Sequence, residues 1–246
     1  MHEFLTSLFS GVLDGYLYPF ILEGMLLTIE LALLSLVLAL ALGMLTAVAK
    51  LSQSFAARTV AGIYTTVIRG VPDLVLMFII FFGGQLLVNN FGAWLLEVSD
   101  EAMGWEYIEI SEFVAGVFTI GVVFGAYMGE TFRGGILAVS RGEIEAGHAY
   151  GMTRAQVFFR ITFPAAVRHA LPGFGNNWLV LAKATALVSI IGLEDMVFRA
   201  AQAGGTVRKP FTFYLAVALL YLVITAVSDV GLRWLNKRYS VGVRSA

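Results

Sequence analysis

Long apolar stretches dominate the chain and alternate with short polar segments. Five of them reach the roughly 20 helical residues that a bilayer requires. They lie at about 22–49, 60–88, 113–139, 170–193 and 211–235. Backbone polar groups must be satisfied internally in lipid, so each stretch predicts a spanning helix. The pattern therefore predicts an all-α, polytopic membrane protein with one transmembrane domain over 1–246. Residues 4–20 show helical spacing and are expected at the membrane interface, or as an extension of the first span.

The polar segment between the third and fourth spans (141–164) is too charged to cross a bilayer. Residues 143–164, EIEAGHAYGMTRAQVFFRITFP, carry five ionisable side chains, and each would cost a few kcal/mol at hydrocarbon depth. The spacing predicts two short helices with a break at Gly151 and an N-cap at Thr153, and Pro164 should end or kink the second. An exposed helix pair with an apolar face suits a partner protein or the lipid headgroups.

Composition supports the membrane assignment and narrows the chemistry. The 246 residues are 59% hydrophobic and 13% charged, with a mean hydropathy of +0.83. The net charge of −1 argues against nucleic acid as a partner. The chain has no cysteine, its three histidines lack metal-ligand spacing, and no lysine follows a glycine as a phosphate-binding loop requires. We therefore expect no cofactor in this chain, and any ATP must be bound by another one.

Basic residues predict the orientation in the membrane. Lys50 and Arg58 flank the first loop, whereas loop 89–112 is acidic and has no basic residue. The third loop and the C-terminal tail are basic again. The excess of positive charge on the cytoplasmic side places the C-terminus inside and the N-terminus outside. Three cations in the last external loop oppose this assignment but are outnumbered: Arg199, Arg208 and Lys209.

Polar side chains within the spans are candidates for substrate binding, because they are costly unless they face a cavity or a partner. The candidates are Arg69, Asp73, Glu130, Lys183 and Thr185. Arg69 and Asp73 are four residues apart, which predicts one shared helix face, with Pro72 loosening the backbone between them. Asp73 stands in an apolar run and would suit a cationic substrate group. The alternative is that these residues pair and lock the bundle, as Glu130 could with Arg133.

Small residues predict close helix packing within two of the spans. Ala39-x-x-x-Gly43 lies in the first span and Gly125-x-x-x-Gly129 in the third. Such spacing allows two helix backbones to approach closely.

The charged loop carries a recognisable signature. Glu145-Ala146-Gly147, then Gly151, then Ile161-x-Phe163-Pro164 resembles the EAA motif of the membrane subunits of binding-protein-dependent ABC importers. Gly147 and Phe163 depart from the usual Ala and Leu. Four further stretches and the tail resemble the polar amino acid permeases of that family, Q type: 65–74, 125–134, 175–178, 183–189 and 239–243.

The resemblance implies the type I importer permease fold in a bacterial inner membrane, with a periplasmic N-terminus. It implies a sister M-type permease or a second copy, two ATP-binding subunits that hold ATP and Mg, and a periplasmic substrate-binding protein. The cargo would be a cationic amino acid such as arginine, lysine, histidine or ornithine, and this chain would not be an enzyme. The residues implied in coupling to the ATPase are Glu145, Ala146, Gly147, Gly151, Ile161 and Pro164.

Within that frame, Asp73 with Glu130 would hold the cationic group of the substrate and Arg69 its α-carboxylate. A proton-coupled secondary carrier would instead use Asp73 and Glu130 as proton relays, but it leaves the charged loop unexplained. An intramembrane enzyme is a third possibility, although no nucleophile–base pair or metal motif stands out.

Overall fold

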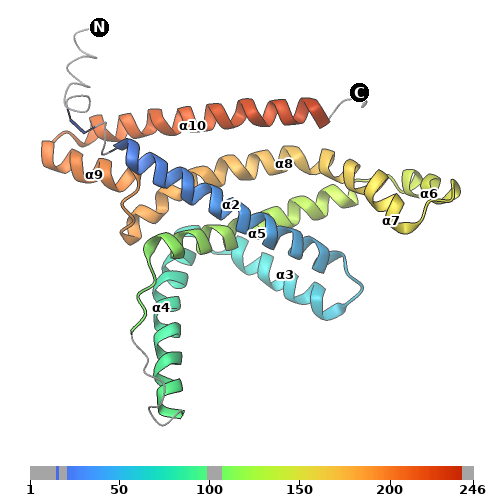
Figure 1. Ribbon diagram of the computed structural model, residues 1–246, viewed down its shortest axis with the longest axis horizontal. Helices are drawn as coiled ribbons and strands as arrows, with labels where there is room; N and C mark the ends of the chain where they lie inside the picture. The colour runs from blue at the N-terminus through green and yellow to red at the C-terminus, as the bar shows by residue number, and fades with distance from the viewer. Residues whose placement is uncertain (1–14, 17–20, 99–106, 240–246) are drawn as a thin grey trace, which may run out of the picture. The chain divides into compact units, whose positions relative to one another are not determined.

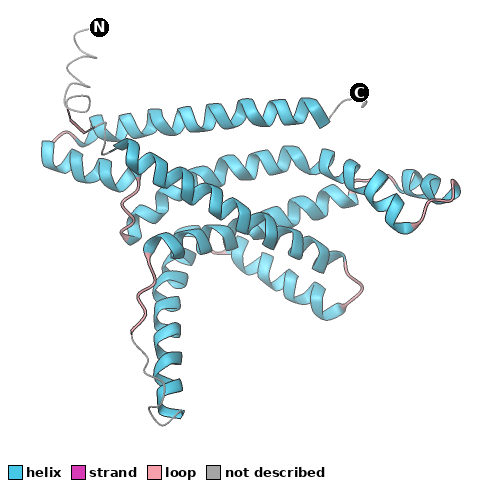
Figure 2. Cartoon of the chain, in the orientation of Figure 1, coloured by secondary structure: helices cyan, strands magenta, loops and turns pink. Residues whose placement is uncertain are grey.

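The computed structural model describes residues 15–16, 21–98 and 107–239, in which helices are joined by short connections (Figure 2). Segment 4–20 and the tail motif from 240 onward lie almost wholly outside these residues. The helices (Figure 1) are α2 (Leu22–Leu51), α3 (Phe55–Gly70), α4 (Asp73–Val98), α5 (Glu112–Leu137), α6 (Arg141–Ala149), α7 (Arg154–Val157), α8 (Phe163–Ala184), α9 (Met196–Val207) and α10 (Pro210–Tyr239). A π-helical turn, η2 (Phe158–Thr162), and a 3-10 segment, η3 (Thr185–Ile191), complete them.

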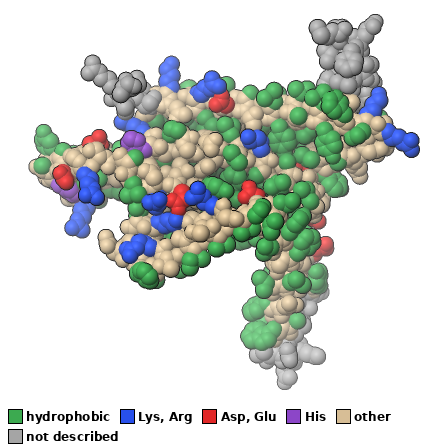
Figure 3. All heavy atoms as spheres, turned by 180° about the vertical axis from the view of Figure 1, so that it is seen from behind, with side chains coloured by type: hydrophobic (Ala, Val, Ile, Leu, Met, Phe, Trp, Pro, Cys, Tyr) green, Lys and Arg blue, Asp and Glu red, His purple; other side chains and the backbone are tan. Residues whose placement is uncertain are grey.

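Within the described residues, five helical segments are long and apolar enough to cross a membrane, which confirms the predicted fold class. They are Leu22–Leu51, Asp73–Leu95, Glu112–Leu137, Arg154–Ile191 and Pro210–Tyr239. Apolar side chains cover α4 and α10 (Figure 3), and large ones such as Leu87 and Val227 are exposed. A surface of this kind is stable when lipid or protein covers it.

The second predicted span is wrong in its bounds. The stretch 60–88 is not one helix, because α3 ends at Gly70 and α4 begins at Asp73. Pro72 is the cause: its ring disfavours helical geometry at the preceding residue, and it has no N–H to donate. Its carbonyl instead accepts the N–H of Leu76 at 3.1 Å and so starts α4. Arg69 and Asp73 therefore do not share a helix face.

The fourth predicted span also begins earlier than expected. Helix α8 starts at Phe163 rather than near residue 170, and Pro164 does not end a helix there. The chain passes without interruption from α7 through the wider η2 turn into α8. At the other end, η3 closes at Gly192, whose φ of +106° is accessible to glycine at little cost.

The chain groups into two compact units, each built from three stretches. Unit 1 comprises Met1–Ser35, Gly70–Gly121 and Ala184–Leu220. In it, α9 packs tightly on the first turns of α2: a Cβ atom on Gly24 would lie 2.8 Å from the backbone of Met196. Arg199 and Glu23 form a salt bridge at 2.9 Å across the same contact. Helix α9 is a further difference from the sequence analysis, which expected a loop there.

Unit 2 comprises Leu36–Arg69, Val122–Lys183 and Tyr221–Ala246. Its centre is the contact of α2 with α5, where a Cβ atom on Gly43 would lie 2.6 Å from Cβ of Met128. Gly125 and Gly129 meet α2 equally closely, at Leu42 and Thr46. The prediction of close packing at these small residues is confirmed. The prediction of a single domain stays a prediction.

Candidate functional site

The charged loop forms a compact hairpin within unit 2, which we call the α6–α7 hairpin (residues 141–162). Helix α6 ends in a Schellman motif, in which Met152 N–H donates to the Gly147 carbonyl at 3.1 Å and Gly151 N–H donates to the His148 carbonyl at 2.9 Å. The motif needs one residue in the left-handed region, and Gly151 supplies it with φ +78°. The predicted break at Gly151 is thus a specific helix end.

The second arm begins with the predicted cap. The N–H of Gln156 donates to Thr153 Oγ1 at 3.3 Å, while the N–H of Thr153 donates to Gln156 Oε1 at 2.9 Å. This reciprocal pair is a capping box, which satisfies two of the free donors at the start of α7. The sequence prediction of an N-cap at Thr153 is confirmed.

Gly147 is the contact point of the two arms. It is buried, and a Cβ atom there would lie 2.6 Å from Cδ1 of Ile161 and 3.1 Å from Cγ2 of Val157. An alanine, which the related motif usually carries, would require the Ile161 side chain to shift. Glycine at this position therefore lets α6 lie unusually close to η2.

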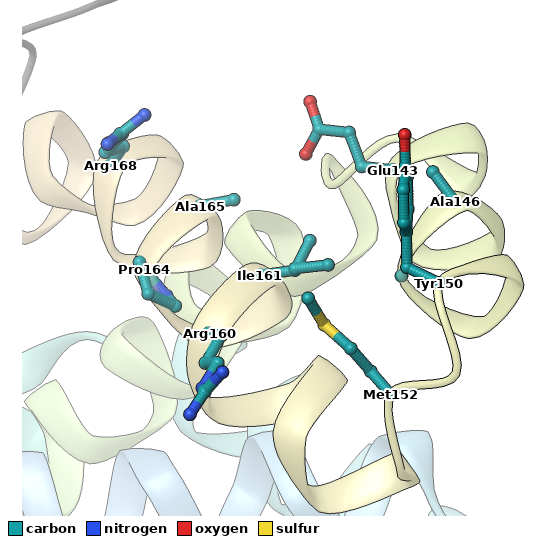
Figure 4. A pocket seen from close by; sticks show the side chains of 10 residues that line it. Glu143, Ala146, Tyr150, Met152, Arg160, Ile161, Pro164, Ala165 and Arg168 are labelled. Atoms are coloured by element: carbon teal, nitrogen blue, oxygen red, sulfur yellow. The ribbon is translucent and has the colours of Figure 1, made fainter.

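A shallow open pocket of about 390 Å³ lies between α6 and the start of α8 (Figure 4). In Figure 4, Met152 and Ile161 point toward each other across it, whereas the guanidinium groups of Arg160 and Arg168 point away. Its lining is Glu143, Ala146, Gly147, Tyr150, Met152, Arg160, Ile161, Pro164, Ala165 and Arg168. Four of the six residues implied in coupling line this pocket, so much of the motif builds the hairpin itself.

Other residues form the hairpin's outer surface. Glu145 is exposed, as are Tyr150 (87% exposed) and Phe159 (68% exposed). Phe159 lies edge-on against Phe158, with ring centroids 5.1 Å apart. Exposed aromatic side chains of this kind are frequent anchors in protein interfaces. Sequence reasoning did not single out Tyr150 or Phe159. They could have been noticed as large aromatic residues in a segment that was predicted to lie in water.

Lys50 organises an ion cluster in unit 2. Its ammonium group donates to Thr65 Oγ1 at 2.5 Å and pairs with the Glu130 carboxylate. The other carboxylate oxygen of Glu130 accepts a hydrogen bond from Nε of Arg133 at 3.0 Å. The structure thus supports the alternative that Glu130 locks the bundle. Sequence reasoning used Lys50 only for orientation, because nothing local showed that its side chain turns back toward the helices.

The remaining substrate candidates are placed as follows. Arg69 lies in the last turn of α3, with its guanidinium carbon 5.2 Å from the centroid of the Tyr127 ring. Asp73 is half-buried in the first turn of α4, where the helix dipole also favours a carboxylate. Lys183 is exposed near the end of α8, and Thr185 is buried at the start of η3. Arg69 and Lys183 belong to unit 2, and Asp73 and Thr185 to unit 1. Their joint role in one site stays a prediction.

A buried acid outside the spans was missed by the sequence analysis. Asp195 is fully buried and caps α9, its Oδ1 accepting the N–H of Phe198 at 2.9 Å. Its Oδ2 has no hydrogen-bond partner among the described residues. Loss of solvation raises the pKa of Asp195 to about 6, although backbone hydrogen bonds at the helix start oppose the shift.

Known proteins resemble this chain over most of its length. The family model for the "binding-protein-dependent transport system inner membrane component" matches residues 39–241. The histidine/lysine/arginine/ornithine transport system permease protein of Escherichia coli is 49% identical over 238 residues, 97% of each chain. The octopine transport system permease protein of Rhizobium radiobacter is 40% identical over 94% of each. A solved amino acid ABC transporter with histidines gives a TM-score of 0.75 at 30% identity, covering 89% of this chain and 94% of that one.

Proposed function

The chain belongs to the family of inner membrane components of binding-protein-dependent transport systems, and from this membership we propose that it carries cationic amino acids into the cytoplasm. It acts as the permease subunit of an ABC importer together with ATPase and substrate-binding components, and hydrolysis occurs on a separate subunit. The observation that carries the choice of cargo is the similarity, over nearly the full length of both chains, to a histidine/lysine/arginine/ornithine permease.

The proposed assembly gives this chain four kinds of neighbour. A sister M-type permease or a second copy of this chain completes the pore, and two ATP-binding subunits hold ATP and Mg. A periplasmic substrate-binding protein delivers the amino acid, and lipid covers the apolar helices. The N-terminus is periplasmic, and the basic end of α10, with Lys237 and Arg238, is cytoplasmic.

The exposed face of the α6–α7 hairpin docks on the ATPase. This proposal is supported by the hairpin's rigid construction, since a Schellman motif ends one arm and a capping box starts the other. Glu145 and the aromatic residues Tyr150 and Phe159 are available on its surface. The residues that face inward, Gly147 and Ile161, keep that surface in one shape.

For the substrate, Asp73 is the group that binds the cation. Glu130 already pairs with Lys50 and Arg133, so its charge is compensated within unit 2. Asp73 opens α4 and is half-buried, which leaves part of the carboxylate accessible. Arg69, Lys183 and Thr185 remain candidates for contacts with the other groups of the substrate.

Substitution of Asp73 tests this assignment. Asp73→Asn preserves shape but removes the charge that attracts a guanidinium or ammonium group, so arginine uptake should fall to background while the complex still assembles. The matched control is Asp229→Asn on α10, whose carboxylate pairs with Arg233 on the same helix. That variant should retain at least half of the normal uptake. Unchanged uptake in Asp73→Asn would show that the acid does not bind the cargo.

The transport class is tested with the purified complex in proteoliposomes, with ATP inside and the binding protein outside. Uptake of labelled arginine that requires both components supports the importer. Uptake that ignores ATP and collapses with the proton gradient would instead establish a secondary carrier. Competition by lysine, histidine and ornithine then defines the range of substrates.

A further inference from the structure

Helix α3 is too short and polar to count among the five spanning segments, yet it carries Arg69 at its C-terminal end. Several contacts within unit 2 fix it to α5. The hydroxyl of Tyr64 donates to the Val122 carbonyl at 2.5 Å, and Arg69 lies over the ring of Tyr127. Neither contact pairs two opposite charges: the first is a hydrogen bond between neutral groups, and the second places a cation over an aromatic ring.

Lys50 joins α2, α3 and α5, because its charged ammonium group contacts Thr65 on α3 and Glu130 on α5. We call Lys50, Thr65 and Glu130 the Lys50 clamp. Lys50 lies in the last turn of α2, Thr65 in the middle of α3 and Glu130 on α5. The Lys50 and Glu130 side chains are 16% and 21% exposed, and Thr65 is buried. Two of the three ammonium donors are therefore used to hold two other helices.

The neighbouring positions of α5 contact the helix that continues from the hairpin. Nδ2 of Asn177 on α8 donates a hydrogen bond to Oγ1 of Thr131 at 2.9 Å. A Cβ atom on Gly173 would lie 2.8 Å from Cγ2 of Thr131. One turn later, a Cβ atom on Gly135 would lie 2.7 Å from the Ala166 carbonyl. Helix α8, which continues directly from the η2 turn of the α6–α7 hairpin, is thus packed on α5. The Lys50 clamp uses the adjacent residue Glu130 of α5.

We propose that Lys50 is a positioning residue that transmits movement of the α6–α7 hairpin to α3. The path runs from the hairpin through α8 to α5, and from Glu130 through the ammonium group to Thr65 on α3. A displacement of α5 then carries α3, and with it Arg69, as one body. This inference rests on the proposed function, because it assigns to Lys50 a part in coupling ATP hydrolysis to transport.

The variants that test it differ in whether they break the contact between helices. Lys50→Met keeps the length of the side chain but removes the charge and both hydrogen bonds. Lys50→Arg keeps the charge and its donors. The matched control is Arg133→Gln, which removes an ion pair from the same carboxylate but only within α5, because Glu130 and Arg133 are three residues apart.

The first readout is the amount of arginine taken up per ATP hydrolysed by the complex in proteoliposomes. Lys50→Met should reduce this ratio at least tenfold while hydrolysis continues, and Lys50→Arg should restore at least half of it. Arg133→Gln should remain within twofold of the wild type. A normal ratio in Lys50→Met, or a loss in Arg133→Gln as large as that in Lys50→Met, overturns the proposal. Failure of the wild-type complex to take up arginine would count against the proposed function instead.

A second readout does not depend on the cargo. Amide hydrogen exchange over Phe55–Gly70 in the assembled complex should rise at least fivefold in Lys50→Met and stay within twofold of the wild type in Arg133→Gln. If Lys50→Met fails to assemble, the charge exchange Lys50→Glu with Glu130→Lys restores the pair and should recover protection of α3. Equal exchange of α3 in wild type and Lys50→Met, or no recovery in the charge exchange, overturns the proposal.

Discussion

Gly151 determines whether the α6–α7 hairpin keeps one conformation. Its φ of +78° lies where a Cβ atom collides with the backbone, and this geometry aligns two hydrogen bonds that end α6. A Cβ atom on Gly151 would find no other atom within 4 Å, so Gly151→Ala adds backbone strain without a packing clash. The change therefore isolates the conformational requirement.

The cost follows from the backbone alone. Placing an L-residue in the left-handed region costs about 1–2 kcal/mol. If the opened hairpin gains that much relative to the closed one, its population rises by a factor of roughly 5–30. Amide exchange at Gly151 and Met152, whose N–H groups close the Schellman motif, should accelerate by the same factor in Gly151→Ala. Gly151→Asn should lie between alanine and wild type, because asparagine tolerates this region better.

The control is Gly142→Ala in the first turn of α6. A Cβ atom there would lie 3.6 Å from Ser140 Oγ, which is an ordinary contact, and alanine favours a helix by about 0.5–1 kcal/mol. Exchange should therefore stay the same or slow down. In the proteoliposome assay, Gly151→Ala should lower the stimulation of ATP hydrolysis by the loaded binding protein, whereas Gly142→Ala should preserve it. Unchanged exchange in Gly151→Ala would refute the reasoning, as would equal loss of stimulation in the two variants.

Two further predictions concern unit 1. Because burial raises the pKa of Asp195 to about 6, the native state binds its proton more tightly than the unfolded chain does, and stability should fall by roughly 3 kcal/mol as pH rises from about 4 through 6. Asp195→Asn should keep the cap and remove this dependence on pH. The measurement is the change in melting temperature between pH 4.5 and 7.5, and an equal change in the wild type and in Asp195→Asn would contradict the prediction. Gly24→Ala should lower the melting temperature by placing a Cβ atom 2.8 Å from the Met196 backbone, at a cost of about 1–3 kcal/mol. Gly62→Ala, where a Cβ atom meets nothing within 4 Å, should not lower it, and equal shifts in the two glycine variants would refute the close contact.

The features that sequence reasoning predicted well are local. Apolar runs long enough to span lipid predicted five segments, and Thr153 predicted an N-cap that the structure contains. The same reasoning failed at Pro72, where an apolar run continues although the helix does not. A hydropathy value does not record that proline lacks an N–H group. The helix break therefore follows from the backbone stereochemistry of Pro72 and not from the hydropathy of the run.

The sequence could not show which polar side chains on different helices pair with one another. Lys50 and Glu130 are 80 residues apart, and their pairing depends on how closely α2 and α5 approach. Nothing in the sequence singled out Asp195, because its burial arises only when α9 packs on the start of α2. Long-range contacts of this kind have no periodic signal along the chain.

By itself the sequence determined the membrane class, the water-exposed position of the charged hairpin and the residue types that its turn requires. These follow from transfer free energies and backbone sterics, which act over a few residues. The tertiary structure decided which charges compensate one another, which residues each glycine contacts and which acid is buried. Such outcomes depend on distances between helices, because a charge or a Cβ atom has a cost only in relation to the neighbours that packing brings to it.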